Sequence, residues 1–91
     1  MTSDGTSLKV LVVDDDPVIR VLLEEVLREW GYAPVLCADG EEGWQTFLAT
    51  PEVRLAVIDW VMPKLEGVEL IRQIRAHERE HDRPATYVIL L

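Results

Sequence analysis

The 91-residue sequence lacks most features that mark secreted, membrane-spanning or nucleic-acid-binding proteins. Its one cysteine, Cys37, cannot form a disulfide within the chain, and a cytoplasmic location is expected. Its apolar runs are strand-sized, too short to cross a membrane. Only 9 Lys and Arg oppose 17 Asp and Glu, and this net charge of −8 argues against direct binding of nucleic acid or an anionic membrane.

Apolar runs instead alternate with amphipathic segments along one domain. Strands are predicted at residues 8–13, 32–38, 53–58 and 87–91, and helices at 17–30, 41–50 and 68–80. Asp16 and Pro17 favour the first helix start, because Asp caps helices and Pro suits their first position. The order βαβαβαβ predicts an α/β fold with a doubly wound parallel sheet and helices on both faces. Residues 1–7 are polar and are expected to form a flexible tail.

Acidic residues stand directly after two of these strands. Asp14 and Asp15 follow the first strand, and Asp59 follows the third. Ligands of open parallel sheets bind at the carboxyl ends of the strands, so the three side chains converge if these strands are neighbours. Like charges about 5 Å apart repel by about 3 kcal/mol per pair at an effective dielectric near 20. A bound Mg²⁺ relieves that repulsion, because hard cations take oxygen ligands.

These residues resemble a known family, the receiver domain of bacterial two-component response regulators. The resemblance rests on Val-Val-Asp-Asp-Asp-Pro at 12–17, Ile-Asp-Trp-Val-Met-Pro at 58–63, and Gly67. It implies a flavodoxin-like sheet of strand order 2-1-3-4 and makes Asp59 the phosphoacceptor for a sensor histidine kinase or phosphotransfer protein. It also implies that Mg²⁺ is bound by Asp14, Asp15, Asp59 and the backbone carbonyl of Val61. A domain of this kind signals to an output domain or partner and is not itself an enzyme.

The sequence departs from the family at its end. Receivers continue through a fifth strand and two more helices, with a Ser or Thr after strand four and a Lys after strand five, whereas this sequence ends at Leu91. Residues 8–91 are therefore expected to be a truncated receiver domain, impaired in phosphorylation and in signal readout. The fourth strand is expected to be an uncovered apolar edge, which predicts self-association of the chain by edge pairing or exchange of an element.

Three other interpretations compete with the receiver interpretation. His-Glu-Arg-Glu-His at 77–81 fits the zinc-protease pattern, but no His or Cys follows to supply a third ligand. Asp14 and Asp16 fit the D-x-D pattern of haloacid-dehalogenase-like phosphatases, although Pro17 and the immediate helix start argue against it. The chain is alternatively a non-phosphorylated interaction or dimerisation module with a degenerate site.

Side-chain spacing also predicts which residues are buried. Cys37 is expected to behave as a small core hydrophobe, and Trp60 to be partly exposed. Apolar residues at helical spacing are expected to face the core in the first two helices: Ile19, Leu22, Leu23, Val26, Leu27 and Trp30, then Trp44, Phe47 and Leu48. Charged residues of the third helix are interpreted as solvated surface: Arg72, Arg75, Arg79 and Arg83 with Glu69, Glu78 and Glu80.

Overall fold

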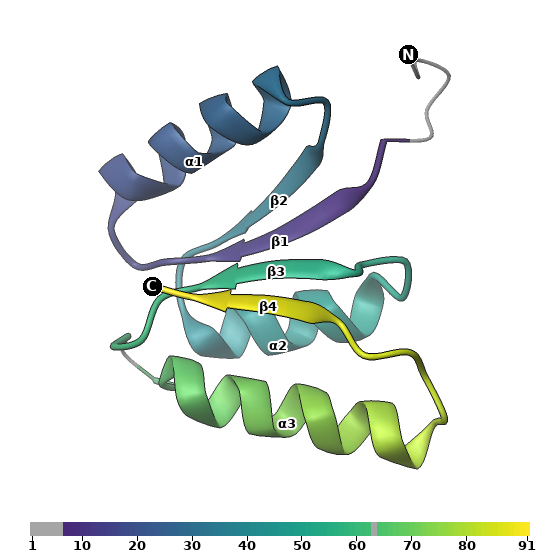
Figure 1. The fold of residues 1–91 in the computed structure, drawn as a ribbon. Helices are drawn as coiled ribbons and strands as arrows, with labels where there is room; N and C mark the ends of the chain where they lie inside the picture. The colour runs from purple at the N-terminus through teal and green to yellow at the C-terminus, as the bar shows by residue number, and fades with distance from the viewer. Residues whose placement is uncertain (1–6, 63) are drawn as a thin grey trace.

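The structure is a computed structural model that describes residues 7–62 and 64–91. The described chain forms β1 (Lys9–Val13), α1 (Pro17–Glu29), β2 (Ala33–Cys37), α2 (Gly40–Ala49), β3 (Leu55–Ile58), α3 (Gly67–Glu80) and β4 (Tyr87–Leu90) (Figure 1). The predicted order βαβαβαβ is confirmed. Residues 1–6 of the expected tail, and Pro63 of the loop after β3, lie outside the described residues.

The four strands form one parallel sheet in the order β2-β1-β3-β4, which confirms the predicted order 2-1-3-4. The helix α1 lies over one face of the sheet, and α2 and α3 lie over the other (Figure 1). Val13 pairs with Cys37 on one side and with Ile58 on the other, so three strands end at the same level. The residues that follow β1 and β3 are therefore neighbours in space.

The sheet separates two apolar clusters, and β1 contributes to both. Val10 and Val12 face α1, whereas Leu11 and Val13 face α2 and α3, because successive strand side chains point to opposite faces. All four are fully buried. Burying a side chain of this size contributes about 1.5–3 kcal/mol. The continuous apolar run of β1 thus follows from its position as a central strand covered on both sides.

The helix starts follow the sequence signals. An Asp16 carboxylate oxygen accepts a 2.9 Å hydrogen bond from the Val18 N–H at the start of α1. Asp39 accepts a 2.8 Å bond from the Glu42 N–H at the start of α2, and this bond is the main reason that the pKa of Asp39 lies below its ordinary value. Gly31 follows α1 with φ of 92°, a conformation that glycine adopts at little cost. No helix among the described residues has both the length and the apolar character needed to cross a membrane.

The predicted inward face of α1 is only partly correct. Leu27 is buried, but Leu22 and Val26 are exposed and Trp30 is 69% exposed. The reason is the layer on this side of the sheet, where α1 lies over β1 and β2 (Figure 1). Val57 of β3 is still buried in one cluster with Leu27, whereas Ile89 of β4 is left exposed. A groove remains there, lined in part by Val26, Trp30 and Ile89. Leu48 at the end of α2 is also partly exposed, so its predicted core position is wrong.

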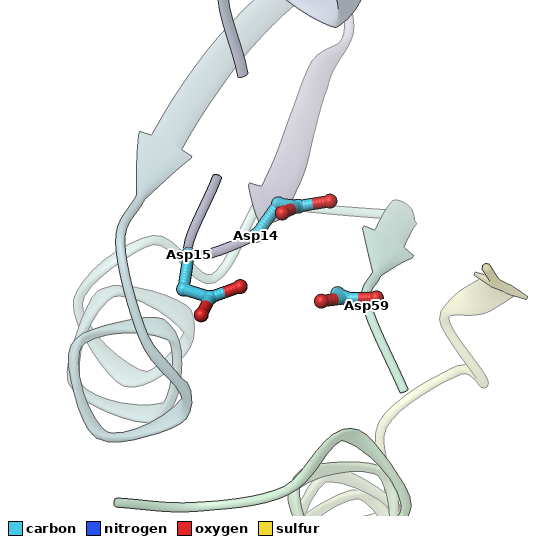
Figure 2. Close-up of side chains that lie close together, drawn as sticks. All are labelled: Asp14, Asp15 and Asp59. Atoms are coloured by element: carbon cyan, nitrogen blue, oxygen red, sulfur yellow. The ribbon is translucent and has the colours of Figure 1, made fainter. Parts of the chain in front are cut away.

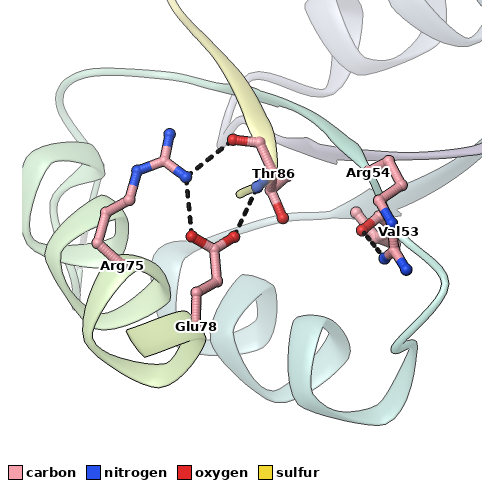
Figure 3. Close-up of polar contacts among 5 residues, drawn as sticks. All are labelled: Val53, Arg54, Arg75, Glu78 and Thr86. Carbon is pink, nitrogen blue, oxygen red and sulfur yellow. Dashed lines mark hydrogen bonds and ion pairs between the residues drawn. The ribbon is translucent and has the colours of Figure 1, made fainter. Parts of the chain in front are cut away.

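The third helix carries a second correction. Glu78 was expected on the solvated surface, yet it is 5% exposed and bonds to Arg75 and to the backbone of Thr86 (Figure 3). Arg83 is also engaged: its guanidinium lies 5.3 Å from the centre of the Phe47 ring and donates a hydrogen bond to the Pro51 carbonyl. Helical periodicity does not reveal the contacts with Thr86, Phe47 and Pro51, because these residues lie outside the helix.

Candidate functional site

The site lies at the carboxyl edge of the sheet, where β1 and β3 end side by side. Asp14 and Asp59 are the first residues after these strands, and the hydrogen-bonded ladder continues through both. The Asp59 N–H donates to the Val13 carbonyl at 2.8 Å, and the Asp14 N–H donates to the Cys37 carbonyl at 3.1 Å. The backbone at both acids is therefore held by the sheet and not by a loop.

The structure brings together the three acids that the sequence singled out. Asp14, Asp15 and Asp59 each offer a carboxylate oxygen, and these oxygen atoms all lie within 4.8 Å of one another. The three side chains face a common space (Figure 2). Asp14 is buried, Asp59 is half-buried and Asp15 is exposed, so the cluster is open to solvent from one side.

Asp16 has a different role from its two neighbours. Its carboxylate caps α1, as the sequence predicted, and its backbone N–H donates a 2.9 Å hydrogen bond to Asp14 Oδ1. Arg20, one turn into α1, donates from Nη1 to the Asp14 backbone carbonyl at 2.7 Å. Sequence reasoning missed Arg20. The available signal was its position four residues after the cap, which returns its side chain toward the end of β1.

The electrostatics of the cluster oppose full ionisation. Burial raises the pKa of Asp59, and the negative charges of Asp14 and Asp15 raise it further. Such charge repulsion is relieved when a carboxylate takes up a proton or when the cluster binds a cation. The donor set suits a hard cation, because Mg²⁺ binds one or more carboxylate oxygens and keeps several waters. The residues present therefore fit a magnesium site.

The loop after β3 brings Gly67 close to the backbone of Asp59 and Trp60. The Gly67 N–H donates to the Trp60 carbonyl at 2.9 Å, and a Cβ at Gly67 would collide with the Asp59 backbone carbonyl. Only glycine allows this approach. Sequence reasoning placed Gly67 in the loop without identifying the contact. Trp60 is 53% exposed, in agreement with prediction, and Val61 is exposed beside it.

The zinc-protease pattern gains no support from the structure. The rings of His77 and His81 lie with their centres 4.1 Å apart and tilted by 30°, and the His81 Nδ1 lies 2.9 Å from the His77 backbone oxygen. Among the described residues, the only group of three or more potential metal-binding side chains in reach of one another is the aspartate cluster. His77 also packs edge-on against Trp44 and Phe47, which is a structural role.

Together, the fold and the site define a class of protein: a doubly wound α/β domain with a cluster of three aspartates at the carboxyl edge of its parallel sheet. Comparison with known families identifies the family within this class. The family model described as the response regulator receiver domain matches residues 10–91. The chain therefore belongs to the receiver domain family of response regulators, whose members are signalling modules that bind Mg²⁺ at an acidic pocket.

Individual relatives support the same assignment. The chain is 34% identical over 82 residues to a chemotaxis protein CheY homolog of Campylobacter jejuni, an alignment that covers 89% of this chain and 63% of the relative. The receiver domain of the Francisella response regulator 1452 is similar with 32% identity and a TM-score of 0.77, over 92% of this chain and 64% of that one. The N-terminal domain of an uncharacterized Wolinella succinogenes protein is similar with 30% identity and a TM-score of 0.81, over 93% and 64%.

Proposed function

We propose that Asp59 accepts a phosphoryl group from a sensor histidine kinase or a phosphotransfer protein, in a cytoplasmic two-component pathway. The observation that carries this proposal is the position of Asp59, which is half-buried, fixed by the β1 ladder and adjacent to two further carboxylates. The phosphorylated domain then signals to an output domain or partner. The proposed role is that of a phosphoacceptor, and the chain itself does not turn over a substrate.

The three acids differ in their suitability as nucleophile. Asp14 is buried, and one of its oxygens accepts the Asp16 N–H, so its approach to a substrate is restricted. Asp15 is exposed, and its position lies beyond the end of the β1–β3 ladder. Asp59 combines partial exposure with a fixed backbone, and in-line phosphoryl transfer depends mainly on such positioning.

In the proposed step, an Asp59 carboxylate oxygen attacks the phosphorus of a phosphohistidine. A P–O bond forms, the P–N bond breaks, and its electron pair returns to the imidazole nitrogen, which takes up a proton. Asp14, Asp15, Asp59 and the Val61 carbonyl are proposed to hold Mg²⁺, which when bound supplies positive charge against the carboxylates and phosphoryl oxygens. Gly67 keeps the space beside the Asp59 backbone clear of side-chain atoms.

The surface beside the acids suits a protein donor. Because α1 starts directly after Asp16, its first two turns border the site, and their side chains Val18, Val21 and Leu22 are exposed and apolar. These residues and Pro17 line a shallow apolar depression. We propose that a helix of the phosphoryl donor packs here, since apolar helix faces commonly bind in such depressions.

Self-association of the 91-residue chain is a further part of the proposal. Within the part of the chain that the structure describes, β4 is an edge strand paired only with β3, and Tyr87 and Ile89 on it are exposed. Unpaired strand edges with apolar side chains favour pairing with another chain. The alternative function, a non-phosphorylated interaction module, rests on this same edge and predicts assembly without phosphate transfer.

Incubation with Mg²⁺ and acetyl phosphate, followed by intact-mass measurement, tests the proposal. The expected result is a gain of one phosphoryl group that disappears in Asp59→Asn, with only part of the wild-type chain labelled because phosphorylation of this chain is expected to be impaired. Asp16→Asn is the matched control, because Asn caps a helix as well as Asp does and this change leaves the cluster intact. Hydrolysis of a phosphate monoester that is abolished in Asp14→Asn or Asp16→Asn but survives Asp59→Asn would instead support the phosphatase interpretation. No gain in the wild-type chain would support the interaction module.

A further inference from the structure

A second carboxylate of interest lies far from the site, at the carboxyl end of α3. Glu78 Oε2 accepts the Thr86 backbone N–H at 2.6 Å, and Glu78 Oε1 accepts from Arg75 Nη1 at 2.9 Å (Figure 3). Arg75 Nη1 also donates to the Thr86 carbonyl at 2.8 Å. Burial disfavours the charged form of Glu78, but the Thr86 N–H and the Arg75 guanidinium more than offset it, so the pKa of Glu78 lies below its ordinary value.

These contacts bind both backbone polar groups of Thr86, which is buried and directly precedes β4. The next N–H, that of Tyr87, donates to the Arg54 carbonyl at 2.8 Å and begins the ladder with β3. Val88 and Leu90 of this four-residue edge strand pack against the core, and a slip of one residue would turn them outward, so their burial and the contacts at Thr86 act together on the register. The cluster of Arg75, Glu78 and Thr86, here termed the β4 clamp, therefore sets where β4 begins.

The other end of β4 reaches the acidic site. The Leu91 N–H donates to the Ile58 carbonyl at 2.9 Å, and the Trp60 N–H donates to the Leu91 carbonyl at 3.2 Å. These two bonds lie on either side of Asp59, whose own N–H is bound to Val13 of β1. The backbone around Asp59 is thus held by a hydrogen bond to β1 on one side and by hydrogen bonds to Leu91, the residue after β4, on the other.

We propose that Arg75 and Glu78 are positioning residues for the acidic site. They hold β4 in register, and β4 in turn fixes the backbone around Asp59 through Leu91. The significance of this restraint for phosphoryl transfer rests on the function proposed above, whereas its effect on the backbone and on cation binding does not. Loss of the β4 clamp therefore loosens the site without unfolding the sheet between β1 and β2.

The same helix provides a matched control. Glu69 and Arg72 form an ion pair at 3.2 Å with the same spacing of three residues as Arg75 and Glu78. That pair is exposed to solvent, bonds to no strand and belongs to a type of contact that contributes little to stability. Glu69→Gln and Glu78→Gln therefore make the same chemical change on one helix, and only the second affects β4.

Amide hydrogen exchange and Mg²⁺ titration of the two variants, both followed by NMR in the whole 91-residue chain, test the proposal. In Glu78→Gln, the Leu91 and Trp60 amides are expected to lose protection by about tenfold relative to the Asp14 amide, as loss of a charge-assisted hydrogen bond predicts. Mg²⁺ affinity is expected to fall several-fold. In Glu69→Gln, both quantities stay at wild-type values.

Two results would overturn the inference. An equal loss of protection at Asp14 and Leu91 would show that the β4 clamp only stabilises the fold in general. Unchanged Mg²⁺ affinity despite loss of protection at Leu91 would show that β4 does not affect the acidic site. If Glu78→Gln does not fold, Arg75→Lys against Arg72→Lys gives the same comparison with the charge retained. Absence of phosphorylation in wild-type protein would contradict the proposed function alone, because exchange and cation binding are measured without phosphate.

Discussion

Asp14, Asp15 and Asp59 place three negative charges within 4.8 Å of one another, and replacing Asp59 with Asn removes one charge with almost no change in shape. We expect Asp59→Asn to be more stable than wild type at neutral pH in the absence of Mg²⁺. The reason is that folding forces the three charges together, whereas the unfolded chain keeps Asp59 apart from Asp14.

The size of the effect follows from the geometry. Two unit charges about 4.8 Å apart repel by about 3 kcal/mol at an effective dielectric near 20. Asp15 is exposed, so solvent screens its share strongly, and the buried Asp14 supplies most of the repulsion. After relaxation, a net gain of about 1 kcal/mol is expected, which raises the Tm of a domain this small by about 4–8 °C.

The pH dependence provides a sharper check. The pKa of Asp59 is raised from 3.8 by burial and by Asp14 and Asp15, so the folded chain binds its proton more tightly than the unfolded chain does. This contribution makes wild-type stability fall as pH rises from the unfolded to the folded pKa. The advantage of Asp59→Asn is therefore largest above the raised pKa and disappears below the ordinary value of 3.8.

Thermal unfolding followed by circular dichroism from about pH 3 to pH 8 measures this difference. Glu25→Gln, an exposed change in the middle of α1, controls for the lower net charge. Mg²⁺ should raise the Tm of wild type more than that of Asp59→Asn, since the variant has one carboxylate fewer. An equal gain in Glu25→Gln, or a Tm for Asp59→Asn at or below wild type at pH 7, would refute the reasoning.

Three further predictions concern other parts of the chain. Cys37 is buried, and burial raises the pKa of its thiol, so it should react with a thiol reagent only on unfolding; rapid reaction in native buffer would contradict this. Gly67→Ala should displace the Asp59 backbone and weaken Mg²⁺ binding, whereas Gly31→Ala, with open space around it, should lower the Tm alone. Light scattering at tens of micromolar should show a self-associated species that Ile89→Lys returns to monomer, and a strictly monomeric wild-type chain would exclude edge pairing.

Much of the fold could be predicted from the sequence, because its signals are local. The apolar run at β1, the cap at Asp16 and the glycine after α1 each act within a few residues. The exposure of Trp30 could not be predicted in this way. Helical spacing shows that an apolar face exists, but which neighbours cover it depends on how the layers assemble.

The polar residues of α3 show more clearly that local sequence does not determine which side chains are buried. Glu69 and Glu78 have similar sequence surroundings, each with an arginine three residues away. One is solvated, and the other is buried against Thr86, a residue eight positions further along the chain. The difference arises from where the chain returns after α3. That path is a property of the tertiary structure, and the periodicity of the helix carries no information about it.

The acidic site could be predicted for a different reason: strand pairing in the sheet places Asp14 and Asp59 next to each other. Once β1 and β3 pair in parallel with Val13 opposite Ile58, the next residue of each strand must be adjacent, whatever the intervening helices do. The position of Asp59 beside Asp14 can therefore be predicted from strand lengths and strand order alone.

The carbonyl of Val61, the fourth proposed Mg²⁺ ligand, is not fixed by such a ladder. Its geometry depends on the loop from Asp59 to Gly67. That loop is restrained by the close approach of Gly67 to Asp59 and by the hydrogen bond from the Trp60 N–H to Leu91. Loss of the β4 clamp should consequently lower Mg²⁺ affinity while the pairing of β1 with β3, which places Asp14 beside Asp59, persists.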